Sequence, residues 1–213
     1  MKLHQIGQDS TTLQNVATND KPTYSEFESL VKIAQGDGQS TRDGNKVTLD
    51  KLTIRGEVVL SKNSSAVWSA GVGSPHLKDG NPTFRVIIFV DTQCNGQGAN
   101  FDDFFDSGPT NEFAFGIYNN INSTGRFKTL MDKWIEVPQS QLVFDGTDFH
   151  ASTSARCLKK TFKNMNLSLT YGDSSANMSS LRTNNIGMFV LCNYLDSDQI
   201  KFAYRVRARF WDY

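Results

Sequence analysis

The sequence predicts an all-β protein, an antiparallel sandwich or barrel of about eight strands with little helix. Most of the chain from residue 46 onward alternates apolar with polar side chains, which is the period of a half-buried strand. Turn-forming pairs such as Asn95-Gly96 and Asp145-Gly146 separate these stretches. Helical spacing is confined to two short segments, Ser25–Ala34 and Asn100–Asp106.

The first predicted strand covers 46–60. Its apolar positions keep mostly to one parity until a shift near Gly56, which predicts a β-bulge or bend there. By the same alternation, further strands are predicted at 84–91, 113–118, 126–137, 141–144, 158–171, 185–194 and 200–211.

Residues 1–40 are polar and only weakly patterned. They predict an arm or a loosely docked lead-in, so we divide the chain into an N-terminal arm at 1–40 and one β domain at 41–213. The chain has 213 residues, which suffices for one large core.

The charges cancel, with 22 Lys and Arg against 22 Asp and Glu, and zero net charge disfavours bulk attraction to nucleic acid or anionic membranes. Along the chain, however, 41–78 carries six basic and three acidic residues, 79–112 one and six, and 156–213 nine and four. Strands from the two basic stretches, if paired in a sheet, would build one positive face.

The last predicted strand sorts its side chains by period two. Five apolar side chains lie on one face, and Arg205, Arg207 and Arg209 lie on the other. Adjacent guanidinium groups repel one another unless anions face them, and those anions are either carboxylates of a neighbouring strand or subunit, or phosphates.

Catalytic motifs are absent from the sequence, so we expect no enzyme activity and no cofactor. The three histidines, His4, His76 and His150, are far apart, which disfavours a cupin-like metal enzyme, and the three cysteines form no C-x-x-C pair. Four loop aspartates are either candidate ligands for a structural calcium ion or solvated turn residues: Asp145, Asp148, Asp196 and Asp198.

Several segments in order resemble a known family. They are Leu52–Gly56, Phe84–Gln93 followed by Asn95-Gly96, Arg126–Lys133, and Thr183–Ile186 leading to Arg205–Asp212. Together they are similar to the capsid proteins of circovirus-like, circular Rep-encoding single-stranded DNA viruses (CRESS-DNA viruses). A related pattern occurs in the satellite tobacco necrosis virus coat protein, and the resemblance covers roughly residues 35–212.

The resemblance implies a single eight-stranded antiparallel jelly roll of two packed four-stranded sheets. It also implies self-assembly into a sixty-subunit, T=1 icosahedral shell around a single-stranded genome, in a virion assembled inside the host cell, with the nucleus as a candidate compartment. Such proteins usually begin with an Arg/Lys-rich arm, whereas residues 1–40 here hold three lysines and no arginine. Either the natural arm is missing from this sequence, or the genome is packaged mainly by residues of the folded domain, and in both cases we expect only weak genome binding by this chain. No apolar run approaches the roughly 20 residues of a bilayer span, so we expect no membrane insertion.

The candidate nucleic-acid contacts are basic residues of the early, middle and late strands: Lys46, Lys51, Arg55, Arg126, Lys128, Lys133, Lys159, Lys160, Lys163, Arg205, Arg207 and Arg209. The alternative hypothesis is a lectin-like jelly roll, in which an exposed Trp68, Trp134 or Trp211 stacks on sugar rings.

Overall fold

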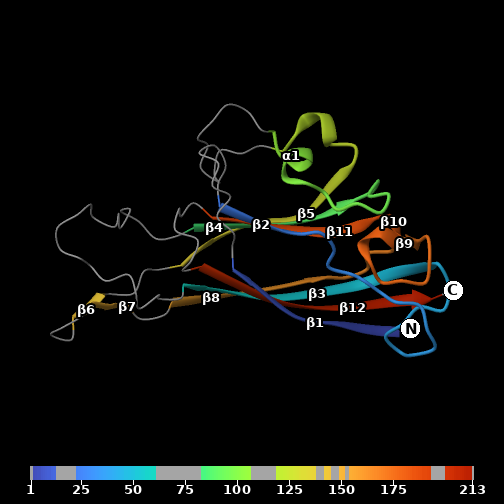
Figure 1. Ribbon diagram of the computed structural model, residues 1–213, viewed down its shortest axis with the longest axis horizontal. Coiled ribbons are helices and arrows are strands. Elements are labelled where there is room, and N and C mark those ends of the chain that lie inside the picture. Colours follow the sequence, from blue (N-terminus) through green and yellow to red (C-terminus); the bar gives the residue numbers. More distant parts are fainter. Residues whose placement is uncertain are drawn as a thin grey trace.

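The computed structural model describes residues 2–12, 23–60, 83–106, 119–137, 142–144, 149–151, 154–192 and 200–212. Two antiparallel sheets face each other, and a short helical segment lies over the outer side of one of them (Figure 1). The predicted all-β class, with little helix, is confirmed. Within the described part of the chain, no helix is long and apolar enough to cross a bilayer.

The first sheet has six strands in the order β1-β12-β3-β9-β10, and β8 also pairs with β3. Strands β8 and β9 pair in succession with the same edge of β3, so they act as one interrupted strand. The strands of this sheet are β1 (Lys2–Thr12), β3 (Lys46–Leu60), β8 (Ser154–Phe162), β9 (Leu167–Tyr171), β10 (Leu181–Thr183) and β12 (Ile200–Asp212).

The second sheet has four strands in the order β2-β11-β4-β5. They are β2 (Thr23–Phe27), β4 (Thr83–Asp91), β5 (Phe127–Glu136) and β11 (Asn185–Cys192). A separate hairpin pairs β6 (Leu142–Phe144) with β7 (Phe149–Ala151). The helical turns are α1 (Phe101–Phe104), η1 (Ile121–Ser123) and η2 (Met178–Ser180).

The order of the strands is that of a jelly roll. Strands β1, β3, the β8–β9 pair and β12 form one sheet, and β2, β4, β5 and β11 form the other, so strands far apart in sequence are neighbours. The first sheet is larger than the predicted four strands because β8 and β9 are separate and β10 extends its edge.

The structure differs from the expectation for residues 1–40, which contain the first strand of each sheet. β1 pairs with β12 from Lys2↔Phe210 to Thr12↔Lys201, and β2 pairs with β11. The sequences of these segments lack regular apolar alternation, so the pattern does not identify them, and tertiary pairing decides their conformation. The helix expected at Ser25–Ala34 is wrong, since β2 occupies its start.

Several other predicted strands lie where the structure has strands. The segments at 46–60, 84–91 and 126–137 correspond to β3, β4 and β5, and the shorter one at 141–144 corresponds to β6. The predicted helix at Asn100–Asp106 contains α1. The strand predicted at 113–118 lies outside the described residues.

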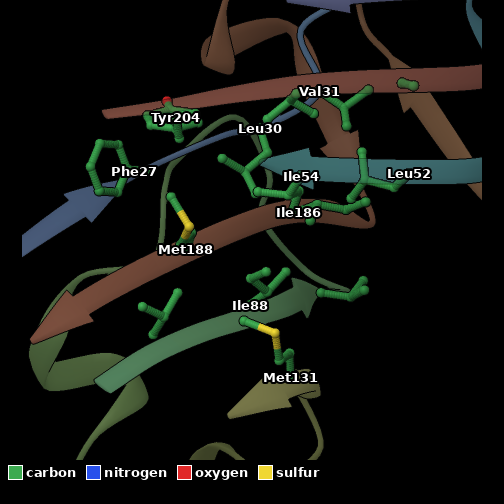
Figure 2. Packing of buried hydrophobic residues seen from close by; sticks show 14 of the residues in the cluster. Phe27, Leu30, Val31, Leu52, Ile54, Ile88, Met131, Ile186, Met188 and Tyr204 are labelled. Atoms are coloured by element: carbon green, nitrogen blue, oxygen red, sulfur yellow. The ribbon is translucent and has the colours of Figure 1, made fainter. Parts of the chain in front are cut away.

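The main core fills the space between the two sheets. Leu52 and Ile54 of β3 and Tyr204 of β12 face Ile88 of β4 and Met188 of β11, and all five are buried (Figure 2). On β12 the alternation is regular from Phe202 to Phe210, as the sequence predicts. Burial of such side chains stabilises the fold by about 25 cal/mol per Å² of apolar surface.

The parity shift in β3 lies at Asp50, not near Gly56. Arg209 of β12 opposes Lys51 and the next residue, Phe210, opposes Leu49, so Asp50 is the extra residue of a β-bulge. Gly56 stays in regular register, and a Cβ there would lie 2.9 Å from the ring of Phe202. That glycine therefore makes room for an aromatic ring instead of bending the strand.

A second apolar cluster covers the outer side of the four-stranded sheet. Its aromatic members are Phe89, Phe189 and Phe127 from the sheet, with Phe101, Phe104 and Phe105 from the segment around α1. Because both faces of this sheet are covered, β4 and β11 are buried along almost their whole length. The six-stranded sheet lies on the opposite side of the molecule from α1 (Figure 1).

Candidate nucleic-acid interface

The outward face of the six-stranded sheet carries a groove of about 570 Å³ on β3, β8 and β12. Six of the twelve predicted basic residues line it, together with two threonines and one valine. The lining residues are Lys51, Thr53, Arg55, Lys159, Thr161, Arg205, Val206, Arg207 and Arg209.

Strand register sets the spacing of these groups. Arg205, Arg55 and Lys159 are direct cross-strand partners, so they form one row of three cations across the sheet. Neighbouring strands lie about 4.8 Å apart. Along β12, successive arginines are two residues apart, or about 6.8 Å. The face is therefore a two-dimensional array of positive charge.

The predicted pairing of the two basic stretches of the chain is confirmed here. β3 belongs to the stretch 41–78, whereas β8 and β12 belong to 156–213, and the sheet places β3 between them. The zero net charge of the chain therefore conceals a strongly cationic surface.

Carboxylates border the array at both ends. Asp50, placed outward by the bulge, accepts a hydrogen bond of 2.7 Å from Arg209 Nε and forms an ion pair with the same guanidinium. Glu57 opposes Ala203, one row beyond Arg205. The anion expected to face the arginines is thus a strand carboxylate for Arg209.

Two uncharged groups of the groove were not in the predicted set. Thr53 and Thr161 are direct partners, and their hydroxyl oxygens are 3.3 Å apart. They share the parity of Lys51, Arg55 and Lys159, so strand alternation could have identified them. Their hydroxyls lie between the row of Arg205, Arg55 and Lys159 and the cross-strand pair of Arg209 and Lys51, where they add hydrogen-bonding groups.

Three of the predicted residues lie on the same sheet but outside the groove. Lys46 begins β3 on the far side of the bulge, opposite Thr170 of β9. Lys160 opposes the buried Ile54, and its ammonium lies 5.5 Å from the centre of the Phe162 ring. Lys163 is exposed in the turn between β8 and β9.

The remaining three predicted residues lie at the other sheet. Arg126 binds both carboxylate oxygens of the buried Asp91 at 2.7 and 2.9 Å and contacts Asp103 at 3.3 Å. The hydrogen bonds to Asp91 raise the pKa of Arg126, and the contact of the same guanidinium with Asp103 links α1 to the sheet. Lys128 and Lys133 are exposed on β5. The twelve residues therefore form one array of six and two scattered groups.

The predicted calcium ligands are not among the residues that the structure describes. All four candidate calcium ligands, Asp145, Asp148, Asp196 and Asp198, lie outside the described residues. Among the residues that are described, no group of three or more His, Cys, Asp or Glu side chains could hold a metal ion. Of the cysteines, Cys94 and Cys192 are buried and Cys157 is exposed, and none forms a disulfide.

Exposed tryptophans do not share a platform in the described structure. Trp134 lies on β5, where the guanidinium of Arg85 is 5.1 Å from its ring centre, and Trp211 lies on β12 in the other sheet. Trp68 lies outside the described residues. A sugar-binding site built from Trp134 and Trp211 together is therefore not supported.

The comparisons with known proteins find matches among solved structures. No protein-family model and no curated protein matches the chain. Among solved structures, the chain is similar to one described as the 60-mer BFDV capsid protein, with 8% sequence identity and a TM-score of 0.34. The alignment covers 98% of this chain and 89% of that chain.

Proposed function

We propose that this chain is a viral capsid protein, a structural subunit without catalytic activity. It assembles with copies of itself into a small icosahedral shell, of sixty subunits in the T=1 arrangement, around a single-stranded genome. The observation that carries the proposal is the basic groove on the outward sheet of a jelly roll, because this fold offers a shell-forming body and a phosphate-binding face in one domain.

The architecture supports a building-block role. Jelly rolls are among the folds of viral capsids, and they are compact bodies with broad sides for lateral contacts. Here one side is the aromatic layer around α1 and the other is the cationic sheet, so the two sides differ in chemistry. A subunit with two unlike faces has a defined inside and outside in a closed shell.

The basic groove indicates which face of the subunit would point toward the genome. Six basic residues line one groove, and their combined positive charge favours the binding of a polyanion. We therefore propose that the six-stranded sheet faces the packaged genome and that the layer around α1 faces away from it. In this arrangement the folded domain supplies genome contacts that a basic arm supplies in the family it resembles.

Assembly can be tested on the purified full chain. Light scattering coupled to size-exclusion chromatography, followed by negative-stain electron microscopy, should show closed particles of uniform diameter. The samples should span 0.1 to 1 M NaCl, with and without calcium and a single-stranded oligonucleotide. Monomers under every one of these conditions would exclude the proposal.

A further inference from the structure

The arginine row of β12 ends at an exposed aromatic ring. Arg205, Arg207, Arg209 and Trp211 alternate with buried side chains, so all four point to the outward face of the sheet. Trp211 is 43% exposed and opposes Thr48 of β3. The exposed part of this indole ring is accessible to a ligand.

We propose that this surface, the β12 track, binds single-stranded nucleic acid with the strand running along β12 and a base stacked on Trp211. The inference rests on the proposed function only for the identity of the packaged polymer; the track itself is a property of one subunit. Sequence-independent single-strand binding combines a cationic groove with aromatic side chains that accept bases by stacking.

Access to the bases favours a single strand over a duplex. In a duplex the bases are paired and stacked inside the helix, so none is available to stack on Trp211. In a single strand the bases are unstacked and can reach an exposed aromatic ring, while the phosphates contact the arginines two residues apart along β12.

The carboxylates at the borders of the array restrict where phosphates bind. Asp50 is held by Arg209, and Glu57 lies beyond Arg205. Between them the row of Arg205, Arg55 and Lys159 remains the densest cluster of cations, so the phosphates bind there and the base binds at the Trp211 end.

The experiment measures binding of a fluorescein-labelled oligo(dT), the matching duplex and a heparin oligosaccharide by fluorescence anisotropy and competition. Trp211→Leu removes the stacking surface and keeps an apolar side chain. It should weaken oligo(dT) binding about tenfold, while duplex and heparin binding stay unchanged, because stacking contributes about 1–3 kcal/mol per base. Trp211→Phe should restore most of the loss. Trp134→Leu on the other sheet is the matched control and should change nothing.

A second variant tests the cationic row. Arg55→Gln should weaken all three ligands and lower the slope of log K against log salt for oligo(dT) by about 0.7, the value for one phosphate contact on a single strand. Lys133→Gln on β5 is its control. Thermal unfolding of each variant shows whether it is folded.

The inference is overturned if Trp211→Leu weakens duplex or heparin binding as much as oligo(dT) binding, if it has no effect, or if the folded protein binds no oligo(dT) at 50 mM salt. Particle formation is measured separately. Oligo(dT) binding is measured on unassembled subunits, because the track would face inward in a closed shell. Subunits that form particles but bind no oligo(dT) before assembly would overturn this inference and leave the capsid proposal standing, whereas subunits that bind through Trp211 and stay monomeric would do the reverse.

Discussion

Arg42 is a buried cation whose hydrogen bonds go mainly to backbone carbonyls. Its side chain is fully buried, and the guanidinium lies 4.1 Å from the centre of the Tyr171 ring. Burial lowers the pKa of Arg42. Its guanidinium N–H groups offset the cost of burial by donating hydrogen bonds to acceptors in the β2–β3 and β9–β10 connections. Those acceptors are the carbonyl oxygens of Ile33, Gly44, Asp173 and Ser175 and the side-chain oxygen of Asn45.

Replacing Arg42 should therefore destabilise the whole domain. Arg42→Met leaves one buried and three partly buried carbonyls without this donor, and we expect the free energy of unfolding to fall by about 3 kcal/mol. Arg42→Lys should recover only part of this loss, since an ammonium cannot reach both connections. Urea denaturation measures both. Arg156→Met, at an exposed arginine on β8, should change the stability by less than about 0.5 kcal/mol.

Asp212 makes the stability depend on pH. Its burial raises the pKa, but hydrogen bonds from the Asp43 amide and from Lys2, whose ammonium is 3.1 Å away, outweigh burial, so the pKa is lowered below 3.8. A carboxyl with a depressed native pKa stabilises the fold above its unfolded pKa. That stability should be lost as the pH falls from about 4 through the native pKa.

The measurement is urea denaturation between pH 2.5 and 6 on the wild type and on Asp212→Asn. The variant should be less stable at pH 6, and the difference should shrink toward pH 2.5. Asp37→Asn, at an exposed carboxyl, is the control. A difference that stays constant over this range would contradict the assignment.

Among the elements, α1 depends most on partners elsewhere in the chain. A helix of four residues has too few internal hydrogen bonds to form alone. The ring of Phe189 on β11 lies 5.1 to 5.4 Å from the rings of Phe89, Phe104 and Phe105, and these contacts hold the segment on the sheet. Gly187 opposes Phe89, and a Cβ there would lie 2.5 Å from its ring.

Removing the ring at the centre of this cluster should release α1. Phe189→Ala should lower the free energy of unfolding by about 3–5 kcal/mol, and Phe189→Leu by less because it keeps most of the volume. Hydrogen exchange should accelerate in residues 99–105 of the alanine variant before it does in β3 and β12. Phe162→Ala, at a half-buried ring on β8, is the control.

At the scale of the whole molecule, sequence patterns predict the all-β class, most strands after residue 46, and which side chains of β12 face the core and which face outward. They also predict that the early and late basic strands meet. They do not identify β1 and β2, because these segments lack regular alternation of apolar and polar residues, and only their pairing with β12 and β11 shows that they are strands. Nor could they separate Arg126, bound to Asp91, from the six groove cations, since both kinds are basic residues in strand-like segments.

Deleting residues 1–40 tests whether this segment is a dispensable arm, as predicted, or supplies strands that the fold needs. Deleting residues 1–40 removes one edge strand from each sheet, exposing the backbone edges of β12 and β11. We expect the truncated chain to aggregate or unfold, as measured by soluble yield and far-UV circular dichroism. A truncated chain that is monomeric, with the same melting temperature as the full chain, would show that 1–40 is a dispensable arm.

The bulge at Asp50 has a consequence for how this sheet tolerates changes in length. Removing one residue from a paired strand normally turns every following side chain to the wrong face. Here the deletion of Asp50 would join Leu49 to Lys51 and leave regular alternation against β12 on both sides. The chain would lose the carboxylate bound by Arg209 and the carbonyl that accepts a hydrogen bond of 2.9 Å from the Met165 amide. Asp50 is thus equivalent to a single-residue insertion that the strand has absorbed, and a chain without it should fold with the same topology but without the carboxylate that Arg209 binds.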